Sequence, residues 1–454
     1  MVPMILRTFD HLIRQLRACS ADLPDLRRGD NRIYEMADPV LAAFAVFFTQ
    51  SPSFLAHQRA LRQARGADNA TSLFGMERIP SDNHIRNLLD PVAPAHFFAV
   101  FDDLYESAEE IGLLQQMRSV DGTQLIALDG TRYFSSQSES IHCPCCSQTK
   151  HANGACTHFH SALTPVVVSP GHSQVINLPP EFITPQDGHE KQDCEIAAAK
   201  RWVARNAKRF QGDNVTLLGD DLFAHQPFCR QSLLHGFHYL FTCKPQSHPH
   251  LTQWLAALEP GRELKVLKQR VKDAANRWEH HEYRWVNQAP LTAEDGALKV
   301  NWCQVTITDD HGRQRFHNTY ITDHQIRADN VAGLVSAGRS RWKIENENNN
   351  VLKTKGYHLE HNFGHGQQHL STTLLTLNLL AFLSHTFLAW SDENYRLIRR
   401  QLGARRTFFE DLRSLTRYIC FESWSQMLDF MMKGLEIGPY APAEPKRKRR
   451  RKAR

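Results

Sequence analysis

Three acidic positions could together hold a divalent cation. Asp129 ends an apolar run at residues 124–128 that is typical of a buried strand, and Asp220 and Asp221 end a second such run. Side chains at the carboxyl end of a buried strand leave the sheet and can meet solvent and ligand. Glu345 lies farther along, in a stretch with helical periodicity. Because carboxylate oxygens suit a hard cation such as Mg²⁺, the sequence predicts a carboxylate metal site.

The residues around Glu345 add groups that could meet a phosphate. On a helix, Arg341 precedes Glu345 by one turn and shares its face, whereas Glu347 is about 200° away and cannot join the same site. Arg341 can therefore contact a phosphate near the metal, with an ordinary ion pair to Glu345 as the alternative. Trp342 is expected to pack beneath the helix, with stacking on a flipped base as its alternative role.

These acidic positions occur in the order and context of a known family. The motifs are Leu128 to Thr131 (LDGT), Leu217 to Phe223 (LLGDDLF) and Gly338 to Lys353 (GRSRWKIENENNNVLK). With them the chain resembles the DDE transposases of bacterial insertion sequences, in the branch with an R-W-x-I-E catalytic helix and a β-rich insertion. The resemblance spans about residues 120 to 390, and the interval between the second Asp and the Glu leaves room for that insertion.

The resemblance implies an α/β fold. Its parts are an RNase H-like mixed sheet with helices, a β-rich insertion before the helix of the catalytic Glu, and helical N- and C-terminal regions. It also implies catalysis with two Mg²⁺ ions, for which Mn²⁺ can substitute. Asp129 would bridge both ions, the second Asp would hold one and Glu345 the other.

Only one of the two adjacent aspartates can face the metals, because neighbouring residues on a strand point to opposite faces. The Asp-x-x-aromatic pattern of the family aligns with Asp220 and Phe223, which favours Asp220. Asp221 is the alternative second Asp, and would otherwise cap the following turn.

The resemblance further implies that Arg341, Trp342, Lys353 and Lys355 contact DNA. The family signature often has a Tyr three residues before the Arg, where this chain has Gly338. It often has a Lys six to seven residues after the Glu, whereas Lys353 stands eight after. The following segment, Glu360 to Gly366, resembles the turn that ends the catalytic helix in similar transposases, and a structural role is expected for it.

A polar helix start and a cysteine-rich segment are further candidates. Acidic helix starts lie near the active site in similar transposases, which makes Glu190 a candidate there. Cys143 and Cys146 form a C-x-x-C pair that a structural Zn²⁺ could use, with Cys156 and His160 completing a tetrahedral set. The spacing equally allows His158 as a ligand, or unligated cysteines beside a surface histidine cluster.

The hydrophobic pattern, together with the resemblance, divides the chain into six regions. They are a helical DNA-binding region (1–118), the first part of the catalytic core (119–246), a β-rich insertion (247–325), the second part of the core (326–390), a helical C-terminal region (391–441) and a disordered basic tail (442–454). Within the insertion, the pattern at 264–276 favours a helix.

Composition and charge narrow the setting. The 454 residues carry a net charge of +6, but Lys446 to Arg454 hold eight positive charges, so the basicity lies in a tail that would attract phosphate. The apolar stretch from Leu370 to Trp390 carries several hydroxyl side chains, which favours a buried helix over a membrane span. Without a visible secretory signal, we expect a bacterial cytoplasmic protein associated with the nucleoid.

Together the resemblance and the charge predict a DNA transposase that cleaves phosphodiester bonds at transposon ends and joins them to target DNA. Its partners would be double-stranded DNA, as terminal repeats and target, and a second copy of the chain in the DNA complex. Two alternatives share these features: an inactive transposase-derived DNA-binding protein, and a metal-dependent nuclease without strand transfer.

Overall fold

The computed structural model describes residues 9–28, 32–138, 141, 143, 145–185, 193–258 and 263–442. The chain forms two compact units, each assembled from separate stretches of sequence. The first comprises residues 1–100, 355–357 and 380–454, and the second comprises residues 101–354 and 358–379. Glu190 and the basic residues of the C-terminal tail lie outside the described residues.

The first unit is helical and joins the two ends of the chain. Its helices are α1 (Phe9–Cys19), α2 (Ala37–Phe48), α3 (Phe54–Arg62), α4 (Gly66–Ser72), α5 (Asp82–Leu89), α14 (Glu393–Leu402), α15 (Arg405–Tyr418) and α16 (Trp424–Gly434). Every residue of α2 is buried, which makes it the centre of this unit. Asn69 Nδ2 donates to the carbonyls of Thr416 and Ile419 at 2.6 and 2.7 Å, and Phe9 packs on Trp424. Residues from both predicted helical regions thus share one core.

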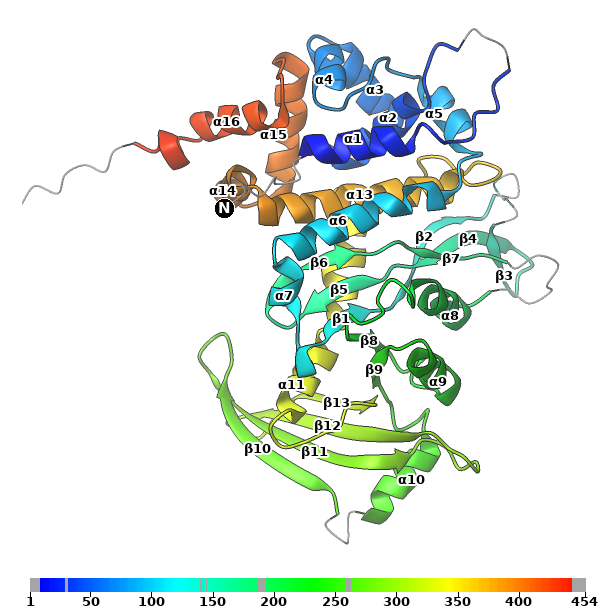
Figure 1. Ribbon diagram of the computed structural model, residues 1–454, viewed down its shortest axis with the longest axis vertical. Coiled ribbons are helices and arrows are strands. Elements are labelled where there is room, and N and C mark those ends of the chain that lie inside the picture. The colour runs from blue at the N-terminus through cyan, green and yellow to red at the C-terminus, as the bar shows by residue number, and fades with distance from the viewer. Residues whose placement is uncertain are drawn as a thin grey trace, which may run out of the picture. The chain divides into compact units, whose positions relative to one another are not determined.

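The second unit is built on a long mixed sheet (Figure 1). Its strands in the described residues are β1 (Gln124–Ala127), β5 (Val166–Ser169), β6 (His172–Asn177), β8 (Val215–Gly219), β9 (His238–Thr242), β10 (Lys265–Lys272), β11 (Trp278–Pro290), β12 (Lys299–Asp309) and β13 (Gln314–Thr322). They lie in the order β10-β11-β12-β13-β9-β8-β1-β5-β6. Strands β1, β5 and β8 are buried along their whole length, as strands covered on both faces must be.

The predicted fold class is confirmed by the pairing of the five central strands. β1, β8 and β9 run parallel, whereas β5 and β6 are antiparallel to their neighbours. Numbered along the chain, these core strands have the order 3-2-1-4-5, which is the order of an RNase H-like sheet. Parallel neighbours end at the same edge, so residues that follow β1 and β8 are brought together.

Strands β10 to β13 form antiparallel pairs and continue the sheet beyond β9, to which β13 pairs (Figure 1). Helix α10 (Pro249–Leu258) precedes them. The helix predicted at 264–276 is wrong, because residues 265–272 form β10. Its apolar residues have helical spacing, yet Val266 and Val271 are exposed, and eight pairings with β11 determine its conformation.

A smaller sheet branches off directly after Asp129. It contains β2 (Gly130–Ser136), β4 (Cys156–Leu163) and β3 (Ser147–Lys150) in that order, and β7 (Glu181–Ile183) pairs with β4. Its first strand therefore leaves the main sheet at the carboxyl end of β1.

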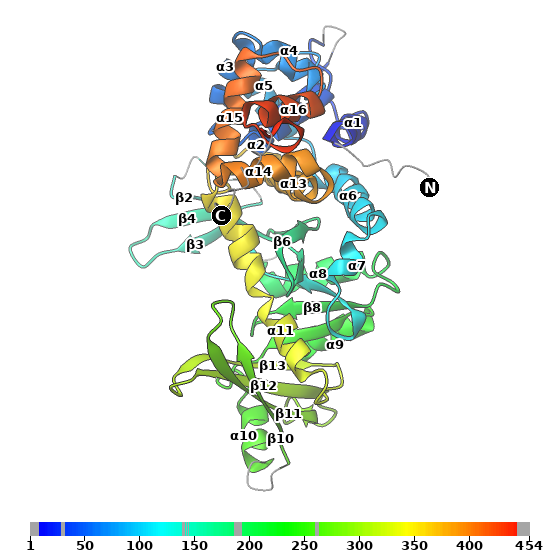
Figure 2. The ribbon, with the colours of Figure 1, turned by 90° about the vertical axis from the view of Figure 1, so that its left-hand side faces the viewer.

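Helices cover both faces of the main sheet. α8 (Glu195–Asn206) and α9 (Gln226–Leu234) lie on one side (Figure 1), and α11 (Val331–Arg339) lies on the other (Figure 2). α11 contacts β9 and β12, and the following π-helical segment η3 (Ile344–Asn349) contacts β5 and β6. The chain from α11 to α12 (Asn350–Thr354) thus crosses the core strands. Helices α6 (Phe98–Glu110) and α7 (Leu113–Met117) precede β1.

One helix of the described residues, α13 (Leu370–Ser391), is long and apolar enough to cross a membrane, and 94% of its apolar window is buried. Its buried hydroxyl residues make hydrogen bonds to carbonyls one turn back, as Thr376 does to Thr372 at 2.9 Å. Such bonds let polar residues sit inside a packed helix.

Gly338 allows helix α11 to approach strand β13. A Cβ atom at this position would lie 2.7 Å from the ring of Tyr320, which is 1% exposed. The ring of Tyr320 therefore fills the space beside the position where the transposase signature often has a tyrosine. This close approach is the physical reason for a glycine there.

Gly338→Ala is expected to lower the free energy of unfolding by about 1 to 3 kcal/mol, because the methyl group overpacks the Tyr320 ring. Gly333→Ala on the same helix is the matched control, since a Cβ there meets no atom within 4 Å. The control should raise stability by about 0.5 to 1 kcal/mol through helix propensity. Urea denaturation measures both, and equal effects of the two changes would contradict the packing account.

Candidate active site

The two strand-end aspartates lie at one edge of the main sheet. Asp129 follows β1 and Asp220 follows β8, and these strands pair in parallel with Ala127 opposite Leu218. The Leu128 amide donates to the Leu218 carbonyl at 2.8 Å, so the parallel pairing continues up to Asp129. Both side chains are partly exposed at this edge.

Glu345 lies in the π-helical segment η3, and such segments are rare and frequently mark functional sites. Arg341 Nη1 donates to Glu345 Oε1 at 3.0 Å, as the shared helix face predicts. The Glu345 side chain is 49% exposed and the Arg341 side chain is 21% exposed, so this pair stands at the surface with the carboxylate more accessible to solvent.

The electrostatics show that these acids form one cluster. Burial and, after it, the negative charges of Glu195, Glu345 and Asp220 raise the pKa of Asp129 to about 7, against the opposing charge of Arg341. Neighbouring carboxylates repel one another when all are ionised, and a bound cation would relieve that repulsion. Such a group of acids is therefore a candidate cation site. Asp220 and Glu345, the other two carboxylates expected from the sequence, thus lie near enough to Asp129 for their charges to act on it.

Glu195 is a fourth acid at this site that sequence reasoning missed. It is the first residue of α8, and its Oε1 accepts a hydrogen bond from the Gly130 amide at 2.8 Å. A Cβ at Gly130 would lie 2.8 Å from Glu195 Cδ, so the glycine makes room for this carboxylate. Burial raises the pKa of Glu195. The acidic helix start was a usable signal, but it pointed to Glu190, which lies outside the described residues.

Buried asparagines hold Asp129 in place. Asn349 Nδ2 donates to Asp129 Oδ2 at 3.3 Å, while Asn349 Oδ1 accepts from the Thr164 hydroxyl at 3.0 Å. Asn348 is fully buried and accepts from Asn177 Nδ2 at 2.7 Å. The asparagine run after Glu345 therefore ties η3 to β6 and to the connection between β4 and β5, and it orients the Asp129 carboxylate.

Lys343 anchors the same helical segment to strands β5 and β6. Its side chain is buried, and its Nζ donates to the carbonyl of His172 at 2.5 Å and also to that of Ser169. Burial lowers the pKa of Lys343. These carbonyls lie at the end of β5 and the start of β6, so Lys343 fixes the start of η3 against the sheet.

Asp221 is engaged away from this cluster. Its Oδ1 accepts from the Lys244 amide at 2.5 Å, its other oxygen accepts from the Ser247 hydroxyl, and His248 lies 3.4 Å from it. These partners belong to the turn between β9 and α10. Asp221 therefore stabilises a turn, whereas Asp220 contributes its charge at Asp129.

The expected DNA-contacting residues are placed differently from one another. Trp342 is 45% exposed, so the expectation that it packs beneath the helix is wrong. Lys353 forms an ion pair with Glu360 at 2.9 Å. Lys355 is exposed and belongs to the first unit. Arg341 thus lies at the carboxylates, where it pairs with Glu345, whereas Lys353 already has an acidic partner.

The cysteine and histidine cluster forms with one change of ligand. Cys143, Cys146 and His160 come together, but the fourth member is His365. Cys156, expected from the sequence, lies four residues before His160 on β4, or roughly 13 Å along the strand, and its Sγ contacts Gln148 Oε1 at 3.5 Å. Spacing alone could not identify a ligand 205 residues away from His160.

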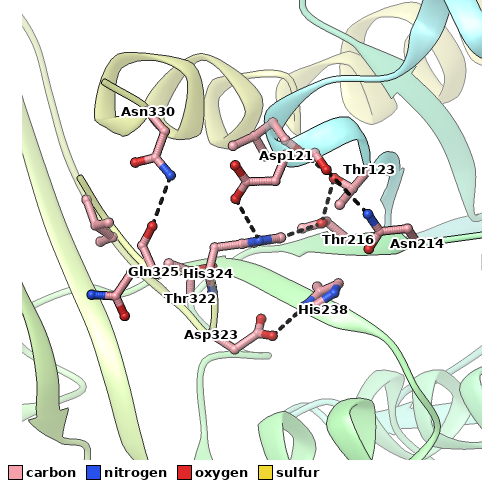
Figure 3. Close-up of polar contacts among 12 residues, drawn as sticks. Asp121, Thr123, Asn214, Thr216, His238, Thr322, Asp323, His324, Gln325 and Asn330 are labelled. Atoms are coloured by element: carbon pink, nitrogen blue, oxygen red, sulfur yellow. Dashed lines mark hydrogen bonds and ion pairs between the residues drawn. The ribbon is translucent and has the colours of Figure 1, made fainter. Parts of the chain in front are cut away.

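A second polar cluster lies at the opposite ends of the parallel strands (Figure 3). His238 Nδ1 is 2.5 Å from Asp323 Oδ2, and the rings of His238 and His324 stack at 4.6 Å. His324 contacts Asp121 at 3.3 Å through Nδ1 and Thr216 at 2.8 Å through Nε2. Both nitrogens of His324 are thereby occupied, so we interpret the cluster as a hydrogen-bond network that joins the ends of β8, β9 and β13.

Comparisons with known proteins identify no family for this chain, so its function must be inferred from its own residues. No protein-family model matches the chain, and no curated protein matches it. Among solved structures, it is similar to a piggyBac transposase in a synaptic complex with hairpin DNA. That similarity has 9% sequence identity and a TM-score of 0.38, over 97% of this chain and 84% of the other. A likeness this weak carries no argument here.

Asp129→Asn is expected to stabilise the metal-free protein, because it removes a charge that burial and neighbouring acids disfavour. An acid whose folded pKa is raised, here to about 7, loses stability as pH rises from its unfolded pKa to the folded one. The gain in free energy of unfolding should therefore rise from roughly 1.5 kcal/mol at pH 5 to roughly 4 kcal/mol at pH 8. Urea denaturation with excess chelator measures it; a destabilised variant at pH 8 would contradict the cluster.

His238→Gln is expected to destabilise the protein in a pH-dependent way. The hydrogen bond to Asp323 raises the pKa of His238, so the pair stabilises fully below the unfolded pKa of about 6.5 and less as pH rises through the folded pKa. The loss in free energy of unfolding should be larger at pH 5.5 than at pH 8.5. His311→Gln, in the exposed turn after β12, is the control. Equal losses at both pH values would refute the ion pair.

Proposed function

We propose that this protein is a metal-dependent DNA transposase of the DDE type, which cleaves transposon ends and joins them to target DNA. The observation that carries the proposal is the cluster of Asp129, Asp220, Glu345 and Glu195 at the edge of an RNase H-like sheet. Two of these acids come from neighbouring strand ends and one from a helix that crosses the sheet.

The residues present fit divalent cations. They offer carboxylate oxygens, the ligands that Mg²⁺ prefers, and Arg341 is the cation whose charge acts on Asp129 in the described structure. The pKa of Asp129, raised to about 7 by burial and by its acidic neighbours, shows that the cluster holds more negative charge than Arg341 offsets. When bound, two Mg²⁺ ions stabilise charge on the attacking and leaving oxygens of a phosphodiester and lower the pKa of the attacking water or 3′-hydroxyl.

The protein residues then have separate tasks. Asp129, which is held by Asn349, would serve as a ligand to both metal ions, while Asp220 and Glu345 would each hold one. Glu195 is bound to the Gly130 amide, so we assign it the task of tuning the charge around Asp129. The network around Asn349 keeps the Asp129 oxygens aimed at the same place during the reaction.

Arg341 and Trp342 form the proposed contact with DNA. Arg341 and Glu345 both lie at the surface. The guanidinium of Arg341 can therefore change its partner from Glu345 to a substrate phosphate when the Glu345 carboxylate serves a metal ion. Trp342 borders an open depression together with Arg339, Ser340 and His172, where a base can stack on the exposed indole. Lys353 and Lys355 supply weaker phosphate contacts. We propose that two copies of the chain assemble on paired DNA ends in the bacterial cytoplasm.

Asp220→Asn is expected to reduce Mg²⁺-dependent DNA cleavage by about 10³-fold or more, because it removes a metal ligand. Asp221→Asn is the matched neighbour and should retain cleavage within about tenfold, since Asp221 bonds the turn before α10. The assay uses purified full-length protein, Mg²⁺ and end-labelled linear DNA that carries the element's terminal repeats. Activity lost in Asp221→Asn and kept in Asp220→Asn would reverse the assignment.

The same assay distinguishes transposition from simpler activities. We expect 3′-end nicking at the repeat, followed by joined products when target DNA is present. Cleavage without joined products would indicate a nuclease and contradict strand transfer. DNA binding without cleavage, in protein whose folding is verified by circular dichroism, would indicate an inactive DNA-binding descendant and contradict both enzymatic functions.

A further inference from the structure

Two cysteines and two histidines converge outside the carboxylate cluster. Cys143 and Cys146 lie between β2 and β3, His160 lies on β4, and His365 lies in the connection between α12 and α13. Cys143 and Cys146 are 7% and 9% exposed, and His160 is 1% exposed. All four residues belong to the second unit, so their approach is a property of one compact body.

The distances between the donor atoms are those of a tetrahedron around one ion. Bond lengths to tetrahedral zinc place two sulfurs roughly 3.8 Å apart, sulfur and nitrogen roughly 3.6 Å apart and two nitrogens roughly 3.3 Å apart. The two Sγ atoms are 3.8 Å apart, and the two Nε2 atoms are 3.1 Å apart. The measured sulfur–nitrogen distances are 3.5 Å for Cys143–His160, 3.3 Å for Cys146–His160 and 3.2 Å for Cys146–His365.

The surroundings prepare these atoms as ligands. His365 Nδ1 lies 2.9 Å from the carbonyl oxygen of Gly366. Because a carbonyl can only accept, Nδ1 carries the proton, and Nε2 presents its lone pair to the cluster. The ring centroid of Phe134 lies 5.6 Å from that of His160 and 4.9 Å from that of His365. Tyr133, the preceding residue on β2, also packs on His160. An apolar shell of this kind limits water access to a metal.

We infer that Cys143, Cys146, His160 and His365 bind one structural zinc ion, and that this ion fastens the connection after the Glu345 helix to the small sheet that leaves Asp129. Four protein ligands close the coordination shell, which is the mark of a structural site. A two-iron cluster does not fit, because all four donor atoms lie within 4.8 Å of one another and share one centre. Mixed thiolate and imidazole ligands in tetrahedral geometry select zinc.

The consequence is a clamp between two segments that adjoin the carboxylate cluster. β2 begins at Gly130, directly after Asp129, and residues 358–369 follow the helical segment of Glu345. Residues 358–369 contain no helix or strand before α13 begins, so a bond from His365 to the ion would restrain a stretch that lies outside regular secondary structure. This inference stands apart from the proposed function, since zinc content does not depend on DNA cleavage.

Zinc content tests the ligand set. Full-length protein from metal-replete cells should contain about one zinc per chain by elemental analysis. His365→Ala should weaken zinc binding by about 100-fold or more in a chelator competition, whereas His365→Cys, which restores a ligand, should retain it. Cys156→Ala is the matched control and should keep one zinc. Wild-type protein without zinc, or full zinc retention in His365→Ala, would overturn the site; loss in Cys156→Ala would overturn the ligand assignment.

Hydrogen exchange tests the clamp. Removing zinc with a chelator should accelerate amide exchange in residues 358–369 by about tenfold or more, while β1 and β8 remain protected. Substitution by Co²⁺ should give the intense visible bands of a tetrahedral cobalt thiolate, which His365→Ala should lose. Unchanged exchange in residues 358–369 after verified zinc removal would refute the clamp. Neither readout requires an active enzyme, so a failed cleavage assay and a failed zinc site are distinguishable results.

Discussion

The mutual repulsion of acidic side chains at one edge of the main sheet is the constraint on which the site depends. Asp129 is partly buried and lies within reach of the charges of Glu195, Glu345 and Asp220, and its pKa is raised to about 7 as a result. A fold can hold such a group in place only if the surrounding residues cannot relax away from it. The buried asparagines of η3 and the anchored Lys343 supply that rigidity, since they bond to β5, β6 and the turn between them. On the proposed function, the stability lost at this edge would be recovered when a cation binds there.

The architecture converts sequence separation into proximity by two devices. Parallel pairing of β1 and β8 brings Asp129 and Asp220 to the same edge. The helical segment of Glu345, which follows the β-rich strands in the sequence, returns to the core strands at β5 and β6. The clamp proposed at His365 acts on the chain that leaves this segment. Strands β10 to β13 lengthen the sheet without interrupting its core, because among the described residues they join it at its edge through the pairing of β13 with β9.

Much of this arrangement could be predicted from sequence because it rests on local signals. Buried apolar runs followed by Asp indicated β1 and β8, and the Arg341 to Glu345 spacing indicated their shared helix face. What could not be predicted depends on long-range contacts. Glu195 reaches the site because Gly130 has no side chain that would fill its place. His365 takes the place expected for Cys156, because Cys156 lies farther along β4 from the other ligands. Residues 265–272 have helical apolar spacing, yet pairing with β11 makes them an edge strand.

The central claim is that the acids around Asp129 bind a divalent cation at the expense of a proton. Calorimetric titration of Mn²⁺ into zinc-replete protein, repeated in buffers of different ionisation enthalpy, measures both events. Because the pKa of Asp129 is about 7, binding should release about half a proton at pH 7 and almost none at pH 9. Asp129→Asn should lose the binding and the release together. Binding of the same strength in wild-type and variant protein, or no binding at either pH, would contradict the account.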